Sequence, residues 1–288
     1  MSDDDRYSIV IIAFVGNVFS PFYFAERQRL GQADPMDFCA FNIGIYHKKQ
    51  RVWGFTEWPR SHVRRSARSL AFGPNRLERD DDRVEIEVNE TPLSGADRIE
   101  GRITVHLEHP ASGTFHLDEN RKHRWYPIAP SSRITVKLKH PDLRFRGHAY
   151  HDANEGDEPL EAAVRRWHWS RHRLGDDTVV FYDGSRIDDS PFSLALRFSA
   201  AGATPIDPAP LTPLSATRGW FCPRATRSDK GGKVAIINTM ENSPFYARTL
   251  LETSLFGHSV RGIHESLSLD RFVTKWMQWM LPFRIRRA

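Results

Sequence analysis

The chain has 288 residues, of which 40% are hydrophobic and 27% are charged, and its formal net charge is +5. This composition is typical of a folded protein with one or two domains and excludes an intrinsically disordered chain. The longest apolar run near the start, IVIIAFVG at residues 9–16, follows three aspartates. It is shorter than the roughly 18 residues that span a bilayer, so we expect neither a transmembrane helix nor a secretory signal there.

Segments with strand-like alternation recur along the chain, and helix-like segments are few. The clearest strand is RITVKLK, residues 133–139, in which Ile134, Val136 and Leu138 fall on one face. We expect strands at residues 41–58 (with a polar hairpin turn within 46–53), 82–90, 97–108, 132–140, 178–184 and 192–200. Helices are expected at residues 20–32, 159–168 and 267–280. Many strands at regular spacing predict a mainly β protein, an antiparallel sandwich or barrel.

Prolines and small residues displace the strand pattern at residues 199–219, SAAGATPIDPAPLTPLSATRG. We interpret residues 201–218 as a Pro-rich linker or strap. It divides the chain into an N-terminal part, residues 1–200, which holds the candidate active site, and a C-terminal β unit, residues 219–288. Because only about 70 residues follow the strap, we expect strands of the N-terminal part to complete this second unit.

Two polar, aromatic segments stand among the strands: RKHRWYPIAP at residues 121–130 and RGHAYHDANEGDEPLE at residues 146–161. His123 and Trp125 are two positions apart, and so are Tyr150 and Asp152. In an extended strand this spacing puts both side chains of a pair on one face. We therefore expect the four side chains to face one cavity. The alternative is structural: a core tryptophan beside a surface histidine, and a tyrosine and an aspartate that end a strand.

Several reaction classes lack their motifs in this chain. It has neither a phosphate-binding P-loop nor a Gly-rich dinucleotide motif, and GHSVRG at residues 257–262 misses the nucleophile-elbow pattern by one residue. His148 and His151 stand near Asp152, but a spacing of three points them to opposite faces of a strand, so we expect no metal site. Cys39 and Cys222 lack metal-ligand spacing and are typical of a reducing cytoplasm.

The order of segments along nearly the whole chain resembles the carotenoid 1,2-hydratase family (hydroxyneurosporene synthase). The resemblance rests on the collinear succession of IIAFVGNVFSPFYF (11–24), DPMDFCAFNIGIY (34–46), TEWPR (56–60), HRWYPIAP (123–130), YHDANEGDEPLE (150–161), WHWSR (167–171), ENSPFYAR (241–248) and HESLSLDRF (264–272). It implies a fold of two lipocalin-like β units. It also implies cofactor-independent addition of water to the C1–C2 double bond of a lycopene- or neurosporene-type chain. The family pairs H-x-W with Y-x-D, which makes His123, Trp125, Tyr150 and Asp152 the catalytic residues, with Asp152 as the proton donor.

This chemistry suits those residue types. Protonation of the alkene at C2 leaves a tertiary cation at C1, which water captures, so the acid must be protonated at working pH. Burial raises the pKa of a carboxyl group, and the rings of Trp125 and Tyr150 stabilise a cation. His123 is expected to orient Asp152 or to take a proton from water. We expect Trp167, Trp169, Tyr182 and Asp183 to bind substrate as cavity lining, with packing as the alternative, and Asn154 and Glu158 to fix the loop.

An acyclic carotenoid substrate is insoluble in water, so we expect a cytoplasmic protein that contacts membrane lipid peripherally. Residues 272–287 combine aromatic and apolar side chains with a basic end, as interfacial segments do, although core packing is the alternative. The basic cluster at residues 59–69 is either solvated surface or a further attraction to anionic lipid. Because 36 acidic residues nearly balance 41 basic ones, we expect no nucleic-acid partner.

Two other functions stay open from the sequence. The first is a non-catalytic, lipocalin-like protein that binds a carotenoid or lipid, and the second is a related cyclase that acts on another terpenoid by similar acid chemistry. The resemblance also leads us to expect a Trp- and Tyr-rich strand before the acidic turn that precedes IIAFVG, whereas this sequence begins at MSDDDRY, inside or just after that turn. Either the start is misassigned or truncated, or the protein lacks a strand that helps to close the first β unit. In the second case we expect an unpaired sheet edge or an open cavity.

Overall fold

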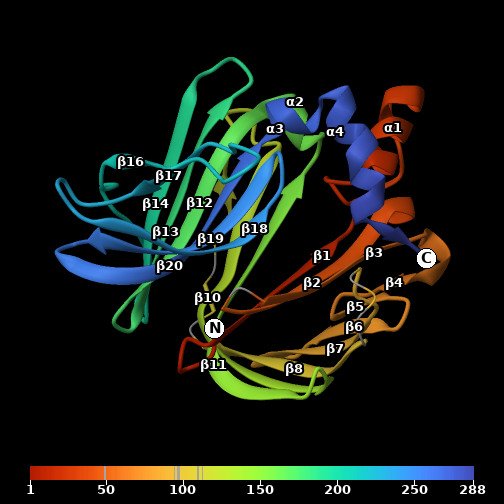
Figure 1. Ribbon diagram of the computed structural model, residues 1–288, viewed down its shortest axis with the longest axis horizontal. Coiled ribbons are helices and arrows are strands. Elements are labelled where there is room, and N and C mark those ends of the chain that lie inside the picture. Colours follow the sequence, from red (N-terminus) through yellow and green to blue (C-terminus); the bar gives the residue numbers. More distant parts are fainter. Residues whose placement is uncertain (49, 94, 96–97, 109, 112) are drawn as a thin grey trace. The chain divides into compact units, whose positions relative to one another are not determined.

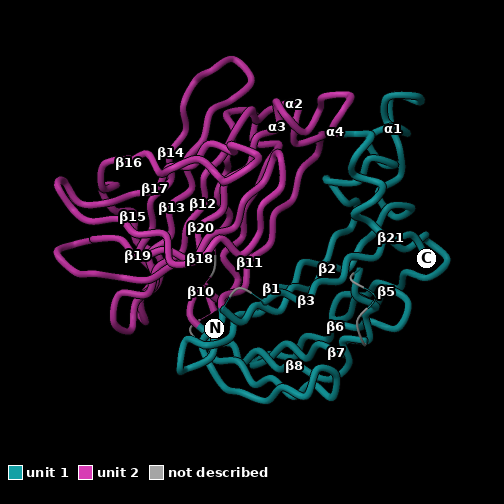
Figure 2. The backbone as a smooth tube through the Cα atoms, viewed as in Figure 1, with its two compact units in different colours: residues 1–108, 132–149, 278–288 teal, residues 109–131, 150–277 magenta. Residues whose placement is uncertain are grey.

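The computed structural model describes residues 1–48, 50–93, 95, 98–108, 110–111 and 113–288. It shows a mainly antiparallel β protein with a few short helices, which confirms the fold class predicted from the strand pattern (Figure 1). The chain forms two compact units (Figure 2). Unit 1 holds residues 1–108, 132–149 and 278–288, and unit 2 holds residues 109–131 and 150–277.

Unit 1 is built from two sheets. The first runs in the order β1 (Tyr7–Phe14), β2 (Cys39–His47), β3 (Gln50–Trp58) and β21 (Arg286–Arg287), and only the last pairing is parallel. The second contains β11 (Leu143–Gly156), β10 (His123–His140), β8 (Ile99–Glu108), β7 (Arg83–Glu90), β6 (Asn75–Arg79), β5 (Ser69–Phe72) and β4 (Val63–Arg65). The short strand β9 (Phe115–His116) pairs with Arg124 and Trp125 of β10 and belongs with them to unit 2. The predicted hairpin of β2 and β3 is confirmed, and Lys49 in its turn lies outside the described residues.

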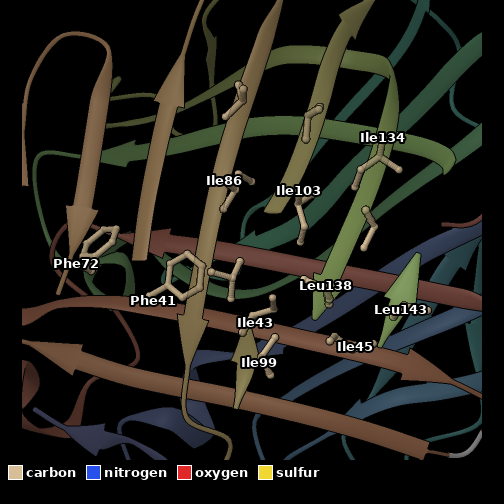
Figure 3. Packing of buried hydrophobic residues seen from close by; sticks show 14 of the residues in the cluster. Phe41, Ile43, Ile45, Phe72, Ile86, Ile99, Ile103, Ile134, Leu138 and Leu143 are labelled. Atoms are coloured by element: carbon tan, nitrogen blue, oxygen red, sulfur yellow. The ribbon is translucent and has the colours of Figure 1, made fainter. Parts of the chain in front are cut away.

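The core of unit 1 follows from the alternation of its strands. Phe41 and Ile43 of β2 pack against side chains of the second sheet, among them Ile86 and Ile103 (Figure 3). The predicted inward face of residues 133–139 is confirmed, because Ile134, Val136 and Leu138 are all buried in this cluster. Each such side chain contributes roughly 1.5–3 kcal/mol when it leaves water.

Unit 2 contains a large sheet and a small one. The large sheet runs in the order β15 (Gly202–Pro205), β14 (Pro191–Ser199), β13 (Asp177–Arg186), β12 (Val164–Leu174), β20 (His258–Ser268), β19 (Tyr246–Leu255) and β18 (Val234–Asn242). The small sheet pairs β16 (Leu211–Leu214) with β17 (Arg224–Arg227). Residues 123–131 of β10 and 150–156 of β11 also belong to unit 2, where they carry the candidate site.

The compact units do not follow the division predicted at residues 201–218. β15 pairs with β14 and β16 pairs with β17, so this segment lies within unit 2 rather than between two units. The strands after residue 219 share a sheet with strands before residue 200, through the pairing of β20 with β12. The long strands β10 and β11 explain the difference, because one hairpin supplies backbone to both units.

The helices are short, and one predicted helix is wrong. The helix predicted at residues 20–32 is confirmed as α1 (Pro21–Leu30), capped by Ser20 and by Gly31 in the left-handed region. At residues 159–168 only α2 (Leu160–Ala163) forms, because β12 begins at Val164 and pairs on both sides. Residues 267–280 divide into the end of β20, α3 (Leu269–Phe272) and α4 (Lys275–Met280). The single-turn 3-10 helices are η1 (Pro35–Phe38), η2 (Arg60–His62) and η3 (Leu281–Arg284). Within the described part of the chain, no helix has the length and apolar character needed to cross a membrane.

A buried ion pair joins β13 to β17 and yields a stability prediction. Arg227 Nε donates to Asp183 Oδ2 at 3.0 Å, its Nη2 bonds to Oδ1, and Ser193 Oγ donates to Oδ1 at 2.7 Å. Asp183→Asn leaves the buried guanidinium without its carboxylate and is expected to lower the free energy of unfolding by about 3–5 kcal/mol in urea. Glu87→Gln, which breaks the exposed pair of Glu87 with Arg102, is the control and should cost less than about 1 kcal/mol. Equal effects of the two substitutions would contradict a structural role for the buried pair.

Candidate active site

The start of β10 turns His123 and Trp125 toward the interior of unit 2. His123, Trp125, Pro127 and Ala129 are buried, whereas residues 124, 126 and 128 between them are partly exposed. Arg124 and Tyr126 on the outer face bind acidic residues of β11 and of the loop after it, Asp157 and Glu155. The spacing of two predicted this shared face of His123 and Trp125.

Trp125 and Tyr150 both donate hydrogen bonds to one oxygen of Asp152. The Trp125 Nε1 to Asp152 Oδ2 distance is 2.8 Å, and the Tyr150 hydroxyl lies 2.9 Å from the same oxygen. Tyr150 and Asp152 therefore share a face of β11, as their spacing predicted, and this face meets Trp125. Three of the four predicted catalytic side chains form one hydrogen-bonded cluster.

Burial dominates the electrostatics of this cluster. It raises the pKa of Asp152 from 3.8 to about 6, the charge of Glu265 acts in the same direction, and the bonds from Trp125 and Tyr150 partly oppose the shift. Burial also raises the pKa of Tyr150, so its hydroxyl stays a neutral donor. The side chains of Tyr150 and Asp152 still keep partial solvent exposure. The site thus contains an acid that holds its proton close to neutral pH and that a ligand can reach.

Aromatic rings surround the acid. The Tyr150 and Trp169 ring centroids are 5.2 Å apart, Trp125 meets Tyr182 edge-on at 6.0 Å, and Trp167 meets Tyr182 edge-on at 5.5 Å. Trp167 and Trp169 are only partly buried, and neither indole N–H has a hydrogen-bond partner among the described residues. The same apolar cluster contains Leu117, Val180, Leu196 and Phe198, with Phe115, Phe192 and Leu194 packed against it.

His123 lies in this part of unit 2 but is not bonded to the acid. Its backbone N–H donates to Asp118 Oδ1 at 2.8 Å, and its ring approaches Gly156, whose missing Cβ leaves the space. Burial lowers the pKa of His123, and its Nε2, 3.9 Å from Glu158 Oε1, has no hydrogen-bond partner in the described structure. A neutral imidazole with an open ring nitrogen can hold a water molecule or a substrate group.

The remaining predicted residues divide between two faces of β13 and the loop after β11. Tyr182 joins the aromatic cluster, but Asp183 points to the other face of β13, where it binds Arg227. The structure therefore does not bring Asp183 together with Trp167, Trp169 and Tyr182. Glu158 pairs with Lys122 at 2.5 Å across the loop, while Asn154 is exposed.

The sequence analysis missed a charged group on β18, β19 and β20. Arg248 Nε donates to Glu265 Oε1 at 2.8 Å, and Arg248 Nη1 donates to Glu241 Oε2 at 3.5 Å. Glu265 pairs in register with Trp169 of β12 and therefore shares its face. Strand alternation gave no signal for Glu265, because the buried face of β20 carries Val260, His264 and Ser266, and Glu265 lies on the less buried face.

Comparisons with known proteins identify the family of the chain and relatives of its fold. Residues 11–288 match the family described as Carotenoid hydratase CrtC. The acyclic carotenoid 1,2-hydratase of Thiocapsa roseopersicina is 41% identical and that of Rubrivivax gelatinosus 38% identical, each over 289 residues that cover 100% of this chain and 71% of the relative. A crystal structure of an AttH protein from Nitrosomonas europaea superposes with a TM-score of 0.58 at 13% identity, covering 92% of this chain and 88% of that chain. That likeness concerns the fold alone and agrees with the predicted lipocalin-like units.

The raised pKa of Asp152 predicts a pH-dependent stability. Since the pKa is about 6 in the folded chain and 3.8 is the ordinary value, the folded chain holds this proton more tightly. Stability from the neutral acid is fully present below pH 3.8 and is lost as the pH rises through 6. Asp152→Asn is expected to raise the free energy of unfolding at pH 8 by up to about 3 kcal/mol and to change it little at pH 4. Urea unfolding at both pH values measures this, and a variant less stable at pH 8 would contradict it.

Proposed function

Because the chain belongs to the Carotenoid hydratase CrtC family, we propose that it acts as an acyclic carotenoid 1,2-hydratase. It is a hydro-lyase that adds water to the C1–C2 double bond of a lycopene- or neurosporene-type end group and yields a tertiary 1-hydroxy product. Four relatives that carry this activity in their names are 34–41% identical to the chain. The observation that carries the proposal is the buried carboxyl group of Asp152, held by Trp125 and Tyr150 among aromatic rings.

Asp152 is the acid of the first step. Its proton goes to C2, the π electrons of the double bond form the new C2–H bond, and the positive charge remains on C1. Trp125 and Tyr150 both bind Oδ2, which leaves Oδ1 to hold the proton and stabilises the carboxylate once the proton has gone. General acid catalysis of this kind contributes about 100- to 10,000-fold to the rate.

The aromatic side chains act on the cation. The partly exposed faces of Tyr150, Trp167 and Trp169 stabilise a positive charge at C1 by roughly 2 kcal/mol or more, because the rings are largely desolvated. Rings do not bond covalently to the cation, as a nearby free carboxylate would, so the cation persists until water adds. Protonation, cation stabilisation and water capture can all be carried out by side chains and water, and we therefore propose that the reaction requires no cofactor.

We also propose that the protein contacts membrane lipid through the segment around α4 and η3. Met277 and Leu281 are buried, whereas Trp279 is 81% and Phe283 is 87% exposed. The segment therefore contributes to the core with one set of side chains and presents large aromatic ones to the solvent, followed by the exposed Arg286 and Arg287. Aromatic and basic side chains together favour the interface of an anionic bilayer, where a long polyene dissolves.

A conversion assay tests the hydratase and its acid. With lycopene or neurosporene in detergent, the chain is expected to form a 1-hydroxy product, and Asp152→Asn should lower turnover by about 100- to 10,000-fold. Above pH 6 the rate should fall about tenfold for each pH unit, because Asp152 loses its proton there. Glu155→Gln, on the outer side of the same strand, is the matched control and should leave turnover unchanged. A chain that retains pigment but forms no product would instead be a binding protein.

Vesicle binding tests the membrane contact. The double substitution Trp279→Ser and Phe283→Ser is expected to weaken partition into phosphatidylcholine–phosphatidylglycerol vesicles by roughly tenfold or more, since about 1.4 kcal/mol of lost apolar contact has that effect. Phe256→Ser, an exposed phenylalanine in the turn between β19 and β20, is the control. Equal losses for control and double variant in a co-sedimentation assay would overturn the assignment to this segment.

A further inference from the structure

A second carboxylate is held in unit 2 by a buried arginine. Arg248 of β19 is 2% exposed, and its Nε donates to Glu265 Oε1 of β20 at 2.8 Å. Glu241 of β18 binds the same guanidinium through Nη1 at 3.5 Å. The Arg248 guanidinium also lies 5.4 Å from the centre of the Tyr246 ring. Burial and, to a lesser degree, the nearby charge of Glu265 raise the pKa of the Tyr246 hydroxyl. Glu265 is thus held by Arg248, with the Tyr246 ring beside the guanidinium.

This carboxylate borders the aromatic cluster around Asp152. Glu265 is the register partner of Trp169, whose ring lies 5.2 Å from that of Tyr150. Tyr150 in turn donates to Asp152, so neighbouring side chains connect the two acids. The Glu265 side chain is 22% exposed, whereas that of Arg248 is 3% exposed. The carboxylate therefore keeps some solvent access, whereas the arginine that holds it is buried.

Packing does not account for this group. A buried ion pair contributes little net stability compared with apolar side chains of the same volume, because both charges lose their hydration. Arg248 and Glu241 are buried, at 2% and 7% exposure, although they lie among charged groups rather than in an apolar cluster. Such a loss of hydration free energy is expected where a buried charge has a role in binding or catalysis rather than in folding stability.

Hydration also requires a proton acceptor. When water attacks the cation at C1, the adduct must release a proton, and the acceptor has to lie on the side from which water comes. His123 is one candidate for this task, and a carboxylate held by arginine is a second. A free carboxylate beside a cation would bond to it, whereas a carboxylate bound by arginine is a weaker nucleophile and still accepts a hydrogen bond from water.

We propose that Glu265 binds the attacking water and takes its proton, with Arg248 as the positioning residue. The inference rests on the proposed hydratase function. A lone pair of the water oxygen forms the C1–O bond, one O–H bond breaks, and that proton passes to the Glu265 carboxylate. Glu265 then returns a proton to Asp152 through solvent. The sum is alkene plus water to alcohol, with both acids restored.

Deuterium uptake separates the two acids. In D₂O the unaltered chain should form hydroxylated product with deuterium at C2. Glu265→Gln should lower hydration at least 100-fold while the recovered alkene still gains deuterium, because Asp152 delivers a deuteron to C2 and then takes back the hydrogen from the same carbon. Asp152→Asn should lose both hydration and exchange. Arg248→Lys keeps the positive charge but loses the planar guanidinium that donates to Glu265, and it should shift the ratio of exchange to hydration in the same direction. This variant tests the proposal if Glu265→Gln does not fold.

The matched control lies between the same two strands. Glu252→Gln removes the exposed pair of Glu252 with Arg261, 3.2 Å apart across β19 and β20, and should leave both hydration and exchange unchanged. The proposal is wrong if Glu265→Gln hydrates at the original rate, or if it loses hydration and exchange in equal proportion. Absence of product from the unaltered chain would instead reject the proposed function, so the two failures are distinguishable.

Discussion

The site depends on keeping one carboxyl group protonated while it stays within reach of a ligand. Asp152 meets this condition because burial raises its pKa to about 6, while two hydrogen bonds to a single oxygen prevent a larger shift. Without Trp125 and Tyr150 the acid would hold its proton more tightly but would be a poorer donor, because its carboxylate would be left unsupported. The compromise between holding and releasing the proton is therefore set by these two side chains.

The fold positions the Asp152 cluster with two strands that are longer than most β-strands. β10 and β11 have 18 and 14 residues, and the halves in unit 1 pack Ile134, Val136 and Leu138 into its core. That core fixes the register of the hairpin, since a slip of one residue would expose all three. The other halves then carry Trp125, Tyr150 and Asp152 in unit 2. A polar, destabilising cluster can persist there because the same strands are held by apolar packing elsewhere.

Strand period was the most informative property of the sequence. It correctly predicted the strand faces on which Trp125, Tyr150 and Asp152 lie, because the alternation of side chains depends only on local backbone geometry. The same rule separates Tyr182 from Asp183, which are adjacent and so point to opposite faces, although both were predicted to line the site. Glu265 could not be found this way, since its meaning depends on Arg248 of a neighbouring strand and on Trp169, far away in the chain. The helix predicted at residues 159–168 failed because pairing with β13 and β20 overrides local helix preference after Val164.

The position of the aromatic rings between the two acids has a chemical reason. If Asp152 and Glu265 touched, they would share a proton, and neither would have the defined state that an acid or a base needs. Trp169 and Tyr150 separate them, yet the charge of Glu265 still helps to raise the pKa of Asp152. In the proposed reaction the rings therefore serve twice, because they keep the proton donor apart from the proposed proton acceptor and present their faces to a cation between the two. An apolar spacer such as leucine would achieve only the first, which is why the proposed reaction favours tryptophan and tyrosine at these positions.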